Sequence, residues 1–99
     1  DFKYLSKLIS KKNIGIIKME VMRNIKPQDN FLQKVRNICN KKKIILIFDE
    51  CTTGYRQNMG GIHLNFKVNP DLAIFGKALG SGFAINAIIG KRKIMKKFT

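Results

Sequence analysis

The sequence predicts an α/β fold in which helices flank a mainly parallel sheet. Four short apolar runs rich in isoleucine, alanine and phenylalanine occur at residues 14–19, 44–48, 72–75 and 84–89, and each has the length of a strand. A segment with helical spacing separates the first two runs. Strand, helix and strand in this order are typical of a parallel sheet. The run IILIF at 44–48 is apolar throughout, which predicts a strand buried on both faces.

The first part of the chain predicts one strand between two helices. Residues 5–12 carry apolar side chains on one face and predict the end of a helix. Residues 14–19 read IGIIKM and predict a short buried strand. Residues 27–30 hold a proline, an aspartate and an asparagine, which can start a helix. Apolar residues then recur at helical spacing until the lysines at 41–43: Phe31, Leu32, Val35 and Ile38.

The second part predicts three strands and the loops between them. Residues 52–61 are polar and contain glycines, so they predict a loop after the strand at 44–48. The strand at 72–75 leads to a glycine-punctuated loop around Lys77, and the strand at 84–89 precedes a helix at 91–98. Three helices are few for covering both faces of such a sheet. We therefore expect residues 1–99 to form an internal part of a larger domain.

Composition narrows the class of protein. Apolar residues make up 44% of the chain, as in ordinary globular proteins, and no apolar run is long enough to span a bilayer. The net charge is +14, but the lysines are scattered, which favours a solvated surface over a nucleic-acid partner. The two isolated cysteines predict neither a disulfide framework nor a zinc site. Free thiols fit a reducing compartment, so we expect a cytoplasmic protein without a membrane or metal partner.

Two residues stand where parallel sheets bind ligands. Asp49 directly follows the strand at 44–48, and Lys77 follows the strand at 72–75. Ligands gather at the carboxyl ends of such strands. A carboxylate and a primary amine placed this way can hold pyridoxal phosphate, with the acid at the ring nitrogen and the lysine on the aldehyde. A protonated ring nitrogen would also compensate the lost hydration of a half-buried carboxylate.

Position alone leaves alternatives open. Asp49 could instead cap a helix or pair with a lysine, and Lys77 could be a surface lysine in a loop. Apolar residues followed by Asp49 and Glu50 also resemble the Walker B segment of ATPases, although the phosphate loop GxxxxGK[ST] is absent from these residues. His63 is the only histidine and lacks a metal-spaced partner, so a structural role is expected. Cys51 has no nearby base for nucleophilic catalysis.

Two segments, IILIFDECTTGYR and NPDLAIFGKALGSGFAINAIIGKRKIM, resemble the class III (fold type I) pyridoxal-phosphate aminotransferases. The resemblance extends upstream through MEVMRNIKPQDNFLQKVRNIC and is closest to the branch of glutamate-1-semialdehyde aminomutase and its sugar-associated relatives. It implies transfer of an amino group between an amino donor and a carbonyl substrate, by an aminotransferase or a 2,1-aminomutase. It also implies a homodimer, because this family shares its cofactor site between subunits.

The resemblance implies roles for three residues. Asp49 binds the pyridine nitrogen, Lys77 forms an imine with the cofactor's aldehyde, and Cys51 packs against the ring face. Thr52 replaces a glutamine or methionine that is common there, which fits the sugar-associated relatives better. The family's phosphate-binding loop and its C-terminal small domain lie outside residues 1–99, so we expect this segment alone to be inactive. A basic fragment that keeps only the fold is a further alternative.

Overall fold

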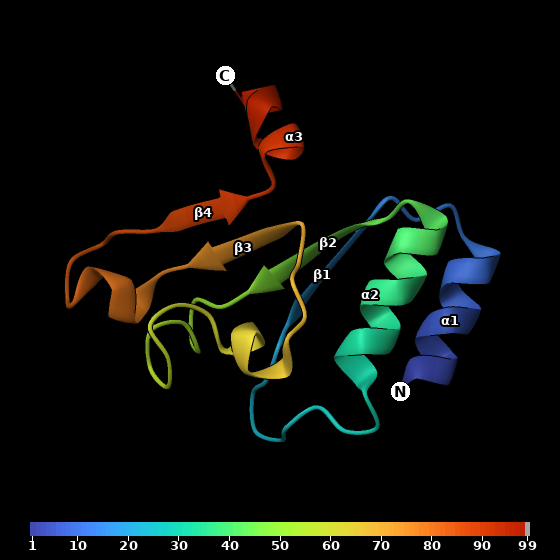
Figure 1. Ribbon diagram of the computed structural model, residues 1–99, viewed down its shortest axis with the longest axis horizontal. Helices are drawn as coiled ribbons and strands as arrows, with labels where there is room; N and C mark the ends of the chain where they lie inside the picture. Colours follow the sequence, from blue (N-terminus) through green and yellow to red (C-terminus); the bar gives the residue numbers. More distant parts are fainter. Residues whose placement is uncertain (99) are drawn as a thin grey trace.

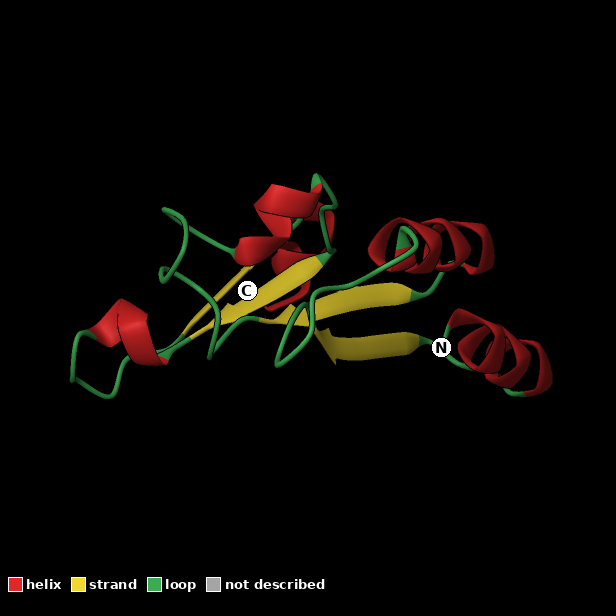
Figure 2. Cartoon of the chain, turned by 90° about the horizontal axis from the view of Figure 1, so that it is seen from below, coloured by secondary structure: helices red, strands yellow, loops and turns green. Residues whose placement is uncertain are grey.

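The computed structural model describes residues 1–98 and contains one four-stranded sheet with helices beside it (Figure 1, Figure 2). The strand order is β1-β2-β3-β4. β1 (Ile16–Glu20), β2 (Ile45–Asp49) and β3 (Leu72–Phe75) run parallel, whereas β4 (Ala87–Gly90) runs antiparallel to β3. The prediction of an α/β fold with a mainly parallel sheet is therefore confirmed.

Two longer helices lie side by side on the β1 side of the sheet, away from β4 (Figure 1). These are α1 (Phe2–Lys11) and α2 (Phe31–Lys42), and α2 connects β1 to β2. Single turns complete the chain: the 3-10 turns η1 (Ile62–Phe66), η2 (Lys77–Gly80) and η3 (Lys96–Phe98), and the short helix α3 (Arg92–Met95). The sequence did not predict η1 or η2, because a single turn shows no helical periodicity.

Within the described residues, the sheet is covered on one face and more open on the other. Leu46 and Phe48 of β2 are fully buried, whereas Ile45 and Ile47, which alternate with them, are half-buried. Ile16, next to Ile45 in the register, is 56% exposed. The predicted burial of β2 on both faces is therefore wrong here, because the helices cover only one of them. The buried cluster on that face joins the helices to the sheet: Ile9, Val21, Leu32, Val35, Cys39, Ile44, Leu46, Phe48, Ile62 and Val68.

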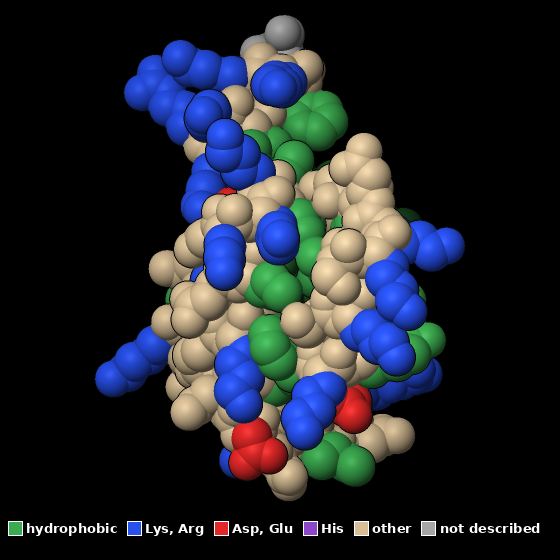
Figure 3. All heavy atoms as spheres, turned by 90° about the vertical axis from the view of Figure 1, so that its right-hand side faces the viewer, with side chains coloured by type: hydrophobic (Ala, Val, Ile, Leu, Met, Phe, Trp, Pro, Cys, Tyr) green, Lys and Arg blue, Asp and Glu red, His purple; other side chains and the backbone are tan. Residues whose placement is uncertain are grey.

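Basic side chains are spread over the surface. Figure 3 shows the side of the molecule where α1 and α2 lie, and Lys and Arg side chains occur at many separate points between small hydrophobic patches. Among residues 1–98, no helix is long and apolar enough to cross a membrane. The same residues hold no group of three or more His, Cys, Asp and Glu side chains suited to a metal ion.

Asp71 joins several elements at the amino ends of β2 and β3. Its carboxylate accepts a hydrogen bond of 2.8 Å from the backbone N–H of Leu46. It also pairs with the guanidinium of Arg36 in α2 at 3.0 Å and with the ammonium of Lys91 at 2.7 Å. Burial alone would raise the pKa of Asp71, but these three donors lower it below its usual value. The ionised side chain therefore holds α2, β2 and the segment after β4 together.

Glu50 fixes the chain at the opposite end of β2. This residue is fully buried. Its carboxylate accepts hydrogen bonds from the hydroxyl of Thr53 at 2.9 Å and the backbone N–H of Ile62 at 2.6 Å, and it contacts Nδ1 of His63. Burial would raise the pKa of Glu50, but the bonds from His63, Thr53 and Ile62 lower it. The loop after β2 is thereby tied to η1.

We expect Glu50→Gln to destabilise the protein by about 1–3 kcal/mol. The substitution removes the negative charge from a buried side chain that accepts several hydrogen bonds. Since folding lowers the pKa of Glu50, the wild-type advantage is present above the ordinary glutamate pKa and fades as the pH falls below it. Thermal unfolding of both proteins from neutral pH to about pH 3 checks this. A gap that stays constant over the whole pH range would contradict it.

Gly61 is required by the same contacts. A Cβ at Gly61 would collide with Oε2 of Glu50 and with the ring of His63, whereas a Cβ at Gly15 would meet nothing within 4 Å. We expect Gly61→Ala to cost about 1–3 kcal/mol of stability, and the matched control Gly15→Ala to leave stability nearly unchanged. Denaturant midpoints measure both. Equal midpoints for the two variants would show that the loop after β2 can move away from Glu50.

Candidate functional site

The carboxyl ends of β2 and β3 point to the side of the sheet where the loop 51–61 and η2 lie (Figure 1). Asp49 is the last residue of β2. Lys77 is the first residue of η2, and only Gly76 separates it from the end of β3. The two parallel strands thus bring the segments that carry both predicted residues to one edge of the sheet, which is where such sheets bind ligands.

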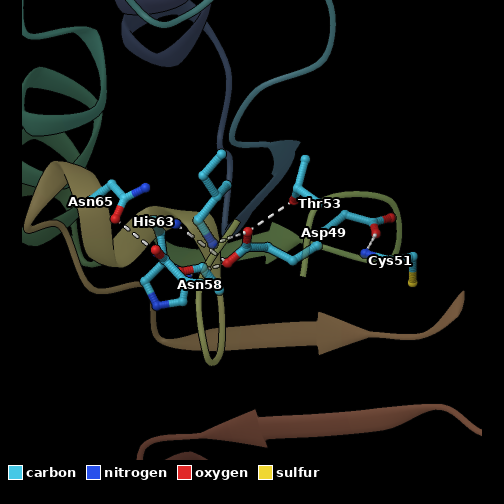
Figure 4. Close-up of polar contacts among 9 residues, drawn as sticks. Asp49, Cys51, Thr53, Asn58, His63 and Asn65 are labelled. Atoms are coloured by element: carbon cyan, nitrogen blue, oxygen red, sulfur yellow. Dashed lines mark hydrogen bonds and ion pairs between the residues drawn. The ribbon is translucent and has the colours of Figure 1, made fainter. Parts of the chain in front are cut away.

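Both carboxylate oxygens of Asp49 have partners. Oδ1 accepts a hydrogen bond of 3.1 Å from the backbone N–H of Cys51, and Figure 4 shows this contact. Oδ2 forms an ion pair of 3.1 Å with Nζ of Lys18 in β1, and the Asp49 side chain is 26% exposed. The pairing with a lysine that the sequence left as an alternative is therefore present. The sequence did not point to Lys18, because only the register of β1 and β2 brings it beside Asp49.

The surroundings of Asp49 favour its ionised form. Burial alone would raise the pKa of Asp49. The hydrogen bond from the backbone N–H of Cys51 and the ammonium of Lys18 outweigh the burial and lower the pKa below its usual value. At neutral pH the side chain is therefore a carboxylate, which can accept a hydrogen bond from a protonated nitrogen.

Lys77 reaches back toward the loop after β2. Its ammonium donates a hydrogen bond of 3.2 Å to the hydroxyl of Thr52 and remains exposed. The backbone of Lys77 has a φ of 42°, a left-handed conformation that is uncommon for a residue with a side chain. Backbone conformations of this kind cluster at functional sites. The predicted loop around Lys77 is a 3-10 turn from Lys77 to Gly80, and Thr52 connects it to β2.

Cys51 lies between the two predicted residues. A Cβ at Gly76 would collide with the side chain of Asn86 and would lie 3.4 Å from Sγ of Cys51, so the chain after β3 passes close to this thiol. Burial and the neighbouring Asp49 carboxylate raise the pKa of Cys51, while the ammonium groups of Lys18 and Lys77 act against them. The side chain is thus a small uncharged thiol at neutral pH.

Glu50 and His63 belong to the interior rather than to this edge. Figure 4 shows Asp49 and Cys51 on one side of the strand end, and His63 with Asn58 on the other. The His63 ring packs near the Phe48 ring, with centroids 5.8 Å apart, and bonds to Glu50. A structural role for His63 therefore agrees with its surroundings. A fully buried Glu50 that already accepts several hydrogen bonds is also unsuited to orienting a water molecule, as a Walker B glutamate does.

Known proteins match this chain closely. Residues 22–99 match the family model described as Aminotransferase class-III. Glutamate-1-semialdehyde 2,1-aminomutase of Acetivibrio thermocellus is 44% identical over 72 residues, which cover 73% of this chain and 17% of that protein. The enzyme of the same name from Methanococcus maripaludis is 48% identical over 75 residues, which cover 76% of this chain and 18% of that protein.

Solved structures agree. The ornithine aminotransferase of Plasmodium yoelii superposes with a TM-score of 0.86 at 30% identity, over 97% of this chain and 27% of that one. N-acetylornithine aminotransferase from Stenotrophomonas maltophilia gives a TM-score of 0.88 at 26% identity, over 97% of this chain and 28% of that one.

This chain spans less than a fifth of the length of the two curated relatives. The Walker B alternative finds no support in these comparisons. The family model covers far more than half of the sequence, and the fold agrees with solved aminotransferases over nearly the whole chain. The chain belongs to the class III aminotransferase family.

Proposed function

We propose that residues 1–99 are the central part of the cofactor-binding large domain of an enzyme that moves an amino group between an amino donor and a carbonyl substrate. Membership of the class III aminotransferase family implies pyridoxal 5'-phosphate as the cofactor. The observation that carries the proposal is the edge of the sheet where an ionised Asp49 ends β2 and Lys77, after β3, bonds to Thr52. A carboxylate and a primary amine at this edge are the groups that hold this cofactor.

The side chains at this edge fit the cofactor chemically. Asp49 is ionised and half-buried, so a protonated pyridine nitrogen is a suitable donor to it. Lys77 is exposed and carries the primary amine that an aldehyde requires. Cys51 is small and uncharged, and such a side chain can pack against an aromatic ring.

The residues of this chain would contribute to the reaction in three ways. When bound, the cofactor supplies an electron sink for the negative charge that develops on the substrate's α-carbon. The carboxylate of Asp49 would hold a proton on the ring nitrogen. Nζ of Lys77 would hold the cofactor and, as a free amine, would accept a proton and return it. The hydroxyl of Thr52 orients Lys77 by accepting its hydrogen bond.

The names of the curated relatives support a finer specificity for the full protein. Both are named glutamate-1-semialdehyde 2,1-aminomutase, and their identities of 44% and 48% favour this branch over a sugar aminotransferase. As an aminotransferase, the full protein would have an amino donor and a carbonyl substrate as partners; as a 2,1-aminomutase, it would move the amino group between two carbons of one substrate. A homodimer remains our expectation for the full protein, from the family resemblance.

We expect Lys77→Ala in the full gene product to lower turnover by about a thousandfold or more, because no other amine would replace its imine and proton-transfer roles.

Asp49→Asn should lower turnover roughly a hundredfold while cofactor still binds, because the ring nitrogen loses its charged partner. Lys7→Ala on the exposed side of α1 is the matched control and should behave as wild type. Steady-state rates and the absorbance of bound cofactor measure these effects, and wild-type rates in Lys77→Ala would refute the proposal.

A further inference from the structure

Lys18 is the side-chain partner of Asp49: it pairs with the carboxylate oxygen that has no hydrogen bond from the backbone. Oδ1 is fixed by the backbone N–H of Cys51, while Oδ2 is paired with Nζ of Lys18 at 3.1 Å. The backbone contact cannot leave without moving the chain. The lysine can, since only its flexible side chain makes the contact. A nitrogen donor that approaches Asp49 could therefore replace Lys18 at Oδ2.

The position of Lys18 follows from the strand register. Lys18 pairs with Ile47 and Glu20 pairs with Asp49 in the parallel ladder, and alternation places the side chains of all four on the same, more open face of the sheet. Lys18 is the one cation in the strand IIKME. It therefore points over the carboxyl end of β2 from a rigid element rather than from a loop.

Two cations compete when they need the same oxygen. A protonated ring nitrogen and the Lys18 ammonium each gain by pairing with Oδ2, and at one carboxylate they repel each other. On the basis of the proposed function, we infer that Lys18 is a positioning residue that competes with the cofactor's ring nitrogen for Oδ2 of Asp49 and so weakens cofactor binding. The lysine side chain must turn away from Oδ2 for the nitrogen to reach the carboxylate at full charge.

The sign of the effect separates this competition from general electrostatics. The cofactor carries a phosphate, so removing any nearby lysine would by itself weaken binding of an anion. Competition for Oδ2 predicts instead that removing Lys18 strengthens cofactor binding, unlike the removal of any other lysine. An exposed ion pair contributes modestly, which corresponds to roughly a two- to fivefold change in dissociation constant.

The test uses the full gene product and pyridoxamine phosphate, which binds without an imine to Lys77. We expect Lys18→Met to bind pyridoxamine phosphate roughly two- to fivefold more tightly than wild type, and Lys18→Arg to bind like wild type because it keeps the cation. The control Lys7→Met removes one charge far from Asp49 and should not tighten binding. Higher ionic strength should narrow the gap between Lys18→Met and wild type.

An analogue of pyridoxamine phosphate with carbon in place of the ring nitrogen gives a second readout. It cannot donate to Asp49, so Lys18→Met should not tighten its binding. Unchanged or weaker binding of pyridoxamine phosphate by Lys18→Met, or equal tightening of both compounds, would overturn the role of Lys18 and leave the proposed function intact. Absence of pyridoxamine phosphate binding by wild type and variant alike would overturn the proposed function together with this inference.

Discussion

Two adjacent carboxylates at the end of β2 point to opposite sides of the chain, and the candidate site depends on this division. Side-chain alternation turns Asp49 toward the open face and lets Glu50 enter the interior. Inside, Glu50 binds the hydroxyl of Thr53 and the backbone of η1, so the loop after the strand has a fixed path. That path presents the N–H of Cys51 to Asp49 and the hydroxyl of Thr52 to Lys77. The buried carboxylate of Glu50 thus positions the residues around Asp49, the carboxylate of the candidate site.

The opposite end of the sheet is fixed in a comparable way. Asp71 binds Arg36 of α2, Lys91 after β4 and the backbone of Leu46, so one ionised side chain sets the relative positions of the strands at their amino ends. The parallel pairing of β1 with β2 then places Lys18 beside Asp49. The open face of the sheet contains half-buried Ile47 and exposed Ile88. The ion pair of Asp49 with Lys18 lies on the same face, at the carboxyl end of β2.

Local sequence pattern was enough to predict the four strands and the two longer helices, but not the single turns η1 and η2 or the contacts between distant residues. The apolar runs located all four strands to within three residues, because short β-rich runs need little context. β4 begins at Ala87 rather than at residue 84, because Ala87 pairs with Phe75, the last residue of β3, and β3 offers no partner to the residues before it. The positions of Asp49 and Lys77 directly after two predicted strands pointed to the candidate site. The Lys18 pair and the buried contact of Glu50 with His63 could not be predicted, because both depend on residues that only the folded chain brings together.

The proposed chemistry requires that the cofactor be attached to Lys77. Borohydride reduction of the full gene product with bound pyridoxal phosphate, followed by peptide mass mapping, tests this attachment. Reduction converts the imine to a stable secondary amine and marks the lysine that carried it. We expect a single phosphopyridoxyl group on the peptide that contains Lys77. The Lys77→Ala variant should carry no such group on that peptide. Modification of a different lysine in the wild-type protein, or no modification at all, would contradict it.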